Sequence, residues 1–175
     1  MNISEVIKNR TSLRVYDDRM IEDQDLEKIL EAASLAPTAG NQQLYSIIVI
    51  KSQETKDKLS ESCDHQPFIA KAPLVLVFCA DCKKWYDAYL EAGCTPRTPG
   101  VGDLMLAVTD TAIAAQNAVV AAESLGIGSC YIGDVLENAE AMRDALHLPQ
   151  YVVPAFMLAV SYTHLRAHET LANLV

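Results

Sequence analysis

The chain has 175 residues, half of them hydrophobic, which suits one globular domain with a substantial core. Its 23 acidic side chains outnumber its 14 Lys and Arg, and the net charge of −9 argues against nucleic acid or an anionic membrane as the main partner. The N-terminus lacks an apolar signal segment, and no apolar run reaches the length expected of a membrane span. The five cysteines are an odd number and have no regular spacing, so we expect a cytoplasmic protein with reduced thiols.

In the first half of the chain the pattern predicts two helices, then two strands separated by a short helix. Ser4 is expected to cap a helix over 4–10, and Asp23 to cap a second helix that ends at Pro37. Strands are predicted over 46–51 and 74–80, a helix over 53–62, and a loop or helical turn over 65–73. The run 74–80 is apolar throughout, which is typical of a strand buried on both faces.

The second half is expected to contain one long buried helix. Residues 83–103 read as an irregular excursion that would border a substrate pocket, and 104–125 as an Ala-rich helix, apolar nearly all round and ended by Gly126. A short strand or turn over 129–134, a helix over 137–146 and a strand over 154–160 follow. Helices and strands without strict alternation indicate an α+β fold.

Residues 1–160 form the predicted domain, and the tail 161–175 differs from it. The tail has no clear amphipathic pattern and carries two of the four histidines, His164 and His168. It is either a segment foreign to this fold or an ordinary C-terminal helix. The histidines have no evident third partner, so we expect no metal site.

Two short clusters are rich in groups that bind ligands. Arg10, Thr11, Ser12 and Arg14 offer two guanidiniums and two hydroxyls, which suit a phosphate, although a solvated basic turn has the same composition. GIGSCYIG at 126–133 follows a helix and not a strand, which argues against a dinucleotide-binding fingerprint. Its glycines either let the backbone approach a planar ligand or simply form a turn.

The segment LAPTAGNQQ at 35–43 is a long, polar connection between a helix and a strand, so we expect it to hold a ligand.

Cys79 and Cys82 form a CxxC pair, but Cys79 ends a strand, which favours two buried thiols over a redox pair. No nucleophile set, metal cluster or phosphate loop is evident in the sequence. Enzymatic chemistry would therefore belong to a bound organic cofactor.

Three segments in this order, NRTSLRVY at 9–16, APTAGNQQ at 36–43 and LGIGSCYIGD at 125–134, resemble the FMN-dependent nitroreductase family in its compact form. The Ala-rich stretch AAQNAVVAAESLGIG is similar to that family's central helix. The resemblance implies an α+β domain with a mixed or antiparallel central sheet flanked by helices. It also implies a homodimer with FMN at the subunit interface, NADH or NADPH as electron donor, and ping-pong reduction of nitroaromatics, quinones or similar small-molecule acceptors.

The resemblance also implies the residues that hold the flavin, with no catalytic side chain because the chemistry occurs at flavin N5. Arg10 and Ser12 would meet the phosphate or ribityl chain, with Thr11 beside them, and Arg14 would lie near N1 and O2. Gln66 would reach the pyrimidine edge. The remaining residues would line the ring: Tyr131, Ile132 and Gly133 from one subunit, and Pro37, Thr38, Ala39, Asn41 and Gln43 from the other.

One segment departs from the family pattern. Family members continue past the last core strand with a Gly-Tyr-Pro-like turn and a basic segment, whereas this chain reads AVSYTHLRAHET with Arg166 as its one Lys or Arg. A flavin-binding protein without turnover is therefore an alternative, and a thiol–disulfide protein that uses Cys79 and Cys82 is a third interpretation.

Overall fold

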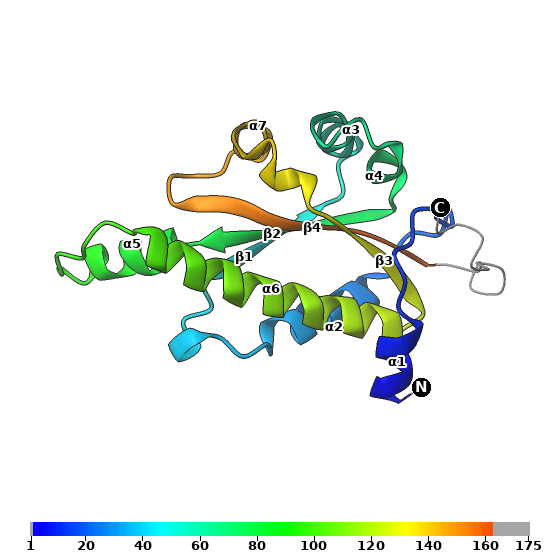
Figure 1. The fold of residues 1–175 in the computed structure, drawn as a ribbon, viewed down its shortest axis with the longest axis horizontal. Helices are drawn as coiled ribbons and strands as arrows, with labels where there is room; N and C mark the ends of the chain where they lie inside the picture. The colour runs from blue at the N-terminus through cyan, green and yellow to red at the C-terminus, as the bar shows by residue number, and fades with distance from the viewer. Residues whose placement is uncertain (1, 163–175) are drawn as a thin grey trace.

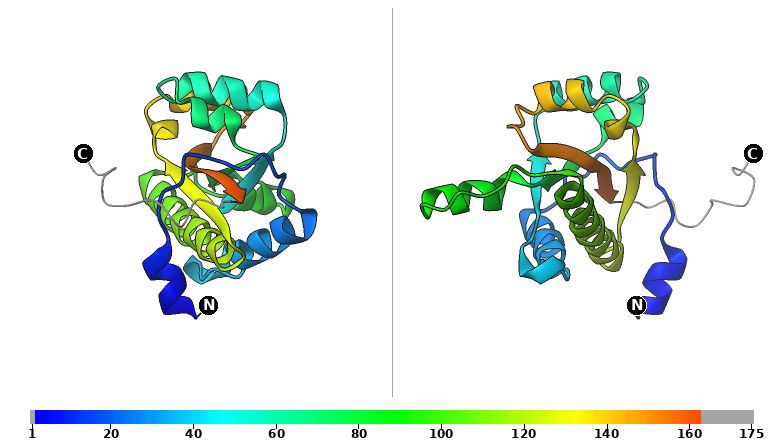
Figure 2. Two further views of the ribbon diagram at one scale, coloured as in Figure 1. Left: turned by 90° about the vertical axis from the view of Figure 1, so that its right-hand side faces the viewer. Right: turned by 60° about the vertical axis from the view of Figure 1, so that its left-hand side comes forward.

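The computed structural model describes residues 2–162, which form a four-stranded antiparallel sheet between two layers of helices. The strand order is β1-β2-β4-β3. Helices α2 and α6 cover one face of the sheet, and α3, α4 and α7 cover the other (Figures 1 and 2). The α+β class, the antiparallel sheet and the long helix predicted from the sequence are confirmed.

The elements follow the chain in this order: α1 (Ile3–Asn9), α2 (Asp23–Ser34), the 3₁₀ helix η1 (Ala39–Asn41), β1 (Tyr45–Ile50), α3 (Gln53–Ser62), α4 (Pro67–Lys71), β2 (Leu74–Asp81), α5 (Lys83–Glu91), α6 (Val101–Ser124), β3 (Ile127–Ile132), the 3₁₀ helix η2 (Asp134–Leu136), α7 (Ala139–Ala145) and β4 (Val152–Tyr162).

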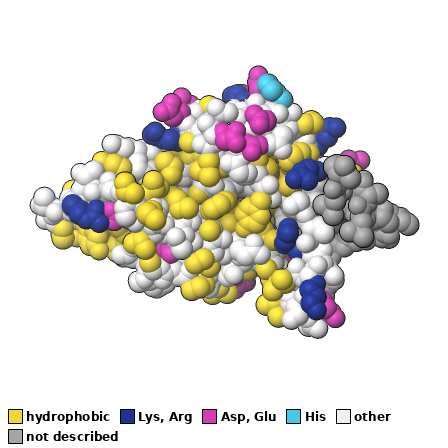
Figure 3. Space-filling model, viewed as in Figure 1, with side chains coloured by type: hydrophobic (Ala, Val, Ile, Leu, Met, Phe, Trp, Pro, Cys, Tyr) yellow, Lys and Arg dark blue, Asp and Glu magenta, His cyan; other side chains and the backbone are white. Residues whose placement is uncertain are grey.

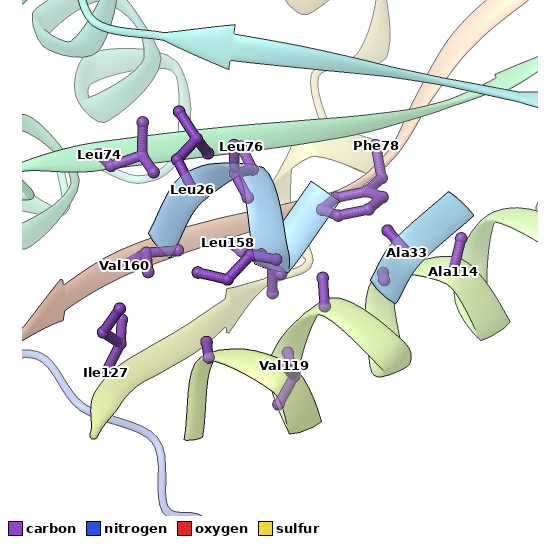
Figure 4. Packing of buried hydrophobic residues seen from close by; sticks show 14 of the residues in the cluster. Leu26, Ala33, Leu74, Leu76, Phe78, Ala114, Val119, Ile127, Leu158 and Val160 are labelled. Atoms are coloured by element: carbon purple, nitrogen blue, oxygen red, sulfur yellow. The ribbon is translucent and has the colours of Figure 1, made fainter. Parts of the chain in front are cut away.

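Strand β2 is the centre of the core, because all eight of its side chains are buried. Leu74, Leu76 and Phe78 point toward α2 and α6, whereas the alternate residues Val75 and Val77 join the cluster on the other face. Figure 4 shows the first set against Ala114 and Val119 of α6 and Leu158 and Val160 of β4. A fully buried side chain of this size contributes about 1.5–3 kcal/mol, so β2 and its neighbours hold the two layers together.

Helix α6 lies on the sheet through a stripe of small side chains. Ala114, Ala115, Ala118 and Ala122 are almost fully buried, which permits close packing of α6 against α2 and the sheet. Its N-terminal part differs from the prediction of an all-round buried helix, because Leu104, Met105 and Leu106 are 40%, 66% and 47% exposed. By length and composition alone α6 could cross a membrane, which differs from the expectation that no apolar run is as long as a membrane span. In the structure its alanines are buried because the helix packs on the sheet.

The predicted helix caps at Ser4 and Asp23 are wrong. Asn2 caps α1 through a capping box with Glu5, and the N-cap of α2 is Glu22, which makes no side-chain cap bond. The predicted Gly126 stop is confirmed, since Gly126 follows the C-cap of α6 with φ +78°.

Two boundaries also differ from the sequence reading. The region expected to be irregular, 83–103, contains the regular helix α5. Strand β4 continues past residue 160, and its last residues Ser161 and Tyr162 are buried. The expected domain boundary at 160 therefore falls inside a strand, and His164, Arg166 and His168 lie outside the described residues.

Candidate functional site

The arginine-rich segment 10–14 is fastened to the edge strand β3. Ser12 forms a parallel β-bridge with Ser129, and the backbone N–H of Leu13 donates to the Ser129 carbonyl at 3.0 Å. The segment comes this close because residue 128 is glycine: a Cβ there would lie 2.7 Å from Leu13 Cδ2. Leu13 is itself buried, so it anchors the hydroxyl and guanidinium groups on either side of it.

The docked segment brings positive charge beside β3. Burial raises the pKa of the Cys130 thiol, while the nearby charges of Arg14 and Arg10 act in the opposite direction. Burial likewise raises the pKa of Tyr131 to about 12, against the influence of Arg10. Within residues 2–162 neither Arg10 nor Arg14 forms an ion pair with a carboxylate. Two uncompensated guanidiniums next to hydroxyl groups suit an anionic ligand.

An open pocket of about 450 Å³ lies at the end of β3, lined by Tyr131, Ile132 and Gly133 together with Ala112, Gln116 and Phe156. The Tyr131 ring packs edge-on against Phe156, with centroids 6.1 Å apart, and its hydroxyl lies 3.4 Å from Gln116 Oε1. No atom outside its immediate chain neighbours lies within 4 Å of where a Gly133 side chain would begin. The pocket is therefore mainly apolar and bordered by exposed backbone, which suits a planar ring.

Helix α4 connects the arginine segment to the pocket. Its Phe68 ring lies under Arg14, with the guanidinium carbon 5.8 Å from the ring centroid. Its N-cap residue Gln66 donates a side-chain hydrogen bond to Asp134, the residue after Gly133. The structure thus gathers three predicted groups on one side of the molecule: Arg10 to Arg14, Tyr131 to Gly133, and Gln66.

The segment 37–43 does not join this cluster within one chain. It leads into β1, which is at the opposite edge of the sheet from β3, three strand spacings or about 14 Å away. Figure 1 shows this light-blue segment on the far side from the dark-blue N-terminal segment. Pro37, Thr38, Ala39, Asn41 and Gln43 are thus separated from Arg10 and Arg14 of the same chain.

A buried carboxylate holds segment 37–43 in place. Asp110 of α6 is 2% exposed and accepts backbone hydrogen bonds from Ala39 at 3.0 Å and Leu44 at 3.3 Å. These bonds fix a loop in which Gly40, Asn41 and Gln43 all have positive φ. The sequence alone does not reveal this anchor, because the partners of Asp110 are about 70 positions away and no local pattern connects them.

Helix α5 supports the same loop from outside. Trp85 Nε1 donates to the Gln42 carbonyl at 2.7 Å, and Lys84 Nζ donates to the Gln43 and Tyr45 carbonyls at 3.0 and 2.8 Å. A second pocket of about 450 Å³ lies here, and its lining includes Gln42, Trp85, Tyr89, Arg97 and Asp103. The start of segment 83–103 is therefore packed against the loop, and the segment borders a pocket.

The cysteines do not form a redox pair. Burial raises the pKa of Cys79 to about 12 and also raises that of Cys82, whereas a reactive thiol requires a lowered pKa. All five cysteines are free, and only Cys94 is exposed. The described residues contain no group of three or more potential metal ligands.

Comparison with known proteins identifies the family of this chain. Residues 7–162 match the sequence profile of the nitroreductase family. An FMN reductase (NADPH) of Bacillus subtilis is 33% identical over 92% of this chain and 66% of its own length, and an oxygen-insensitive NADPH nitroreductase of Salmonella typhimurium is 34% identical over 90% and 64%. The structure of NfrA1 nitroreductase from B. subtilis superposes with a TM-score of 0.92 at 32% identity, covering 97% of this chain and 69% of that one. The chain thus spans about two thirds of the length of these relatives. It belongs to the nitroreductase family.

Proposed function

We propose that this protein binds FMN and transfers reducing equivalents from NADH or NADPH to a small electron-poor acceptor such as a nitroaromatic or a quinone. The observation that carries the proposal is the pair of uncompensated guanidiniums, Arg10 and Arg14, held beside the open pocket at Tyr131 to Gly133. Relatives named as FMN reductases and nitroreductases support it.

The residues present fit the chemistry of FMN. Arg10 with Ser12 and Thr11 supplies charge-assisted donors for the phosphate, and Arg14 places a cation where it stabilises negative charge on the N1 and O2 side of the ring. Tyr131, Ile132 and Gly133 offer a flat surface for the ring, and Gly133 leaves its backbone uncovered. Bound FMN would supply hydride acceptance and donation at N5, so the protein has to position substrates and needs no nucleophile.

A homodimer would complete the site. Residues Pro37, Thr38, Ala39, Asn41 and Gln43 lie at the sheet edge opposite the arginine segment, so they reach a flavin held there only from a second copy of the chain. Exposed apolar side chains support such an interface: Ile3 and Ile7 on α1 are 67% and 60% exposed, and Val101 and Met105 on α6 are 76% and 66% exposed. Figure 3 shows hydrophobic side chains gathered along this side of the molecule.

The setting follows from composition and thiol chemistry. Five free cysteines fit a reducing cytoplasm, and a net charge of −9 disfavours nucleic acid or an anionic membrane as a partner. We therefore propose that the protein acts in the cytoplasm on small molecules.

An absorbance spectrum followed by anaerobic titration with NADH and NADPH tests the proposal. The expected result is a yellow protein, or one that becomes yellow with added FMN, that either nucleotide bleaches. A colourless protein that takes up no FMN would contradict the proposal. A yellow protein that neither nucleotide bleaches would instead support flavin binding without turnover.

Replacing Arg14 by alanine tests the site itself. Loss of a charge-assisted contact of about 1.5–3 kcal/mol should weaken FMN binding by roughly 10- to 150-fold. Lys58→Ala is a matched control, since Lys58 is an exposed cation paired with Glu54 on α3 and should leave FMN affinity unchanged. Equal FMN affinity in Arg14→Ala and the unsubstituted protein would remove Arg14 from the site.

A further inference from the structure

The backbone of Gln66 is fixed before its side chain makes any contact with a ligand. Its N–H points at the carbonyls of Ser60 and Cys63, at 3.1 and 3.2 Å, and its own carbonyl accepts the Ser60 hydroxyl at 2.7 Å. Pro67 follows at the first position of α4 and restricts the chain further. The direction in which the Gln66 side chain leaves the backbone is therefore set by the protein.

The other end of the side chain is fixed by Asp134. Gln66 Nε2 donates to Asp134 Oδ2, and Asp134 begins η2, whose next residue Val135 is completely buried. Burial is the main cause of the raised pKa of Cys63, and the negative charge of Asp134 raises it further. This agrees with a position of the Asp134 carboxylate near the turn between α3 and α4. The contact thus joins two anchored backbone segments, 68 positions apart in the sequence.

The chemistry of this contact determines how the amide is turned. A carboxylate only accepts hydrogen bonds, whereas a Gln side chain ends in a donor and an acceptor that are nearly identical in shape. Asp134 therefore selects the orientation in which the amide nitrogen faces it. The carbonyl Oε1 then faces away from Asp134 and is available as an acceptor.

The neighbours of Gln66 indicate which part of the proposed site its Oε1 acceptor faces. Gly133, directly before Asp134, lines the open pocket, and Phe68, two positions after Gln66, lies under Arg14. Gln66 is therefore connected to both parts of the site: through Asp134 to the pocket assigned to the ring, and through helix α4 to the cation assigned to the N1 and O2 edge. In FMN the group next to O2 on that edge is the N3–H donor, which requires an acceptor.

We propose that Asp134 is a positioning residue that locks the Gln66 amide so that its Oε1 accepts the N3–H of the flavin. This inference rests on the proposed function. It adds a residue that does not itself touch the flavin and that selects for an unsubstituted N3 position. With an uncharged partner in place of Asp134, Gln66 would be free to turn its NH₂ group toward the ring, where it opposes the N3–H donor.

The test compares the binding of FMN with that of 3-methyl-FMN, which has no N3–H, using the full 175-residue chain and quenching of flavin fluorescence. The unsubstituted protein should bind FMN at least about tenfold more tightly, as expected for loss of one well-oriented hydrogen bond. In Asp134→Asn the ratio of the two dissociation constants should fall to roughly threefold or less, because the amide is no longer locked. Glu137→Gln, an exposed acid at the end of η2, is the matched control and should keep the full ratio.

A second variant separates this role from a merely structural one. Gln66→Met keeps the length of the side chain and removes the amide, so it should also abolish the ratio, and Asp134→Asn should add nothing on that background. Asp134→Asn that weakens both flavins equally, with the ratio intact, would overturn the proposal. Failure of the unsubstituted protein to bind either flavin would instead refute the proposed function.

Discussion

Replacing Gly128 by alanine should displace Leu13 from strand β3 and disturb Ser12 and Arg14, which lie on either side of Leu13. The new Cβ would lie 2.7 Å from Leu13 Cδ2 and 3.3 Å from Leu13 Cβ. Ordinary contacts between carbon atoms are about 3.5–4.0 Å, so Leu13 has to move by about 1 Å. Its side chain is 5% exposed and has little free space. Overpacking of this kind costs about 1–3 kcal/mol, which is the expected loss in the free energy of unfolding.

The same substitution should reach the ligand site. Leu13 holds its backbone bond to Ser129 at 3.0 Å and lies between Ser12 and Arg14, so a shift of Leu13 moves both ligand groups. We expect FMN affinity to fall by roughly tenfold, a free-energy change of about 1.4 kcal/mol. Urea unfolding followed by circular dichroism measures the first effect, and flavin fluorescence measures the second.

Two further variants show whether the contact with Leu13 is the cause. Gly102→Ala replaces a glycine in α6 that has nothing within 4 Å, so it should be neutral or slightly stabilising. Leu13→Ala alone should cost about 2–5 kcal/mol, and combining it with Gly128→Ala should cost less than the sum of the two, because the smaller side chain relieves the clash. Strict additivity, or a Gly128→Ala protein as stable as the parent, would refute the close-approach reasoning.

Other substitutions test the remaining supports of the site. Asp110→Asn replaces one of the two carboxylate oxygens by an NH₂ group, which is a donor facing a backbone N–H. It should lower the free energy of unfolding by about 2–4 kcal/mol, and an unchanged urea midpoint would exclude Asp110 as the anchor of segment 37–43. Trp85→Phe removes the 2.7 Å bond to the Gln42 carbonyl and should cost about 0.5–1.5 kcal/mol. Tyr89→Phe is the control and should cost less, because the exposed Tyr89 hydroxyl has no hydrogen-bond partner among residues 2–162. In the native protein at pH 8, a thiol reagent should label Cys94 first, because it alone is exposed and burial raises the pKa of Cys79 to about 12; early labelling of Cys79 in a peptide map would contradict this.

The core of the fold follows from local sequence pattern. Strand β2 is recognisable because seven consecutive apolar residues require burial on both faces, and the structure buries all of them. The long helix is recognisable from its alanines, and Gly126 from the left-handed conformation that ends a helix. In each case the residues that decide the structure are neighbours in the chain.

The features that sequence reasoning missed depend on distant partners. The composition of 83–103 predicts an irregular segment, but Lys84 and Trp85 donate hydrogen bonds to carbonyls about 40 positions away, so tertiary contacts favour the regular helix α5 there. The glycines of 126–133 predict either close approach to a planar ligand or a simple turn, whereas the group that approaches Gly128 in the structure is Leu13 of the same chain. The exposure of Leu104, Met105 and Leu106 at the start of α6 is not predicted for a related reason, since an exposed apolar helix face has the same composition as one buried in the core.

The two halves of the proposed site are rigid for different reasons, and this bears on how a dimer would bind its cofactor. In segment 37–43 the non-glycine residues Asn41 and Gln43 have φ of 55° and 51°, a strain of order 1–3 kcal/mol each. Two backbone bonds to a buried carboxylate, each worth about 1.5–3 kcal/mol, offset that strain inside a single chain. Segment 10–14 is fixed instead by its bridge to β3 and by the buried Leu13. Because each half is ordered before the halves meet, assembly and flavin binding need not repay the entropy of ordering a loop, so more of the contact energy appears as affinity.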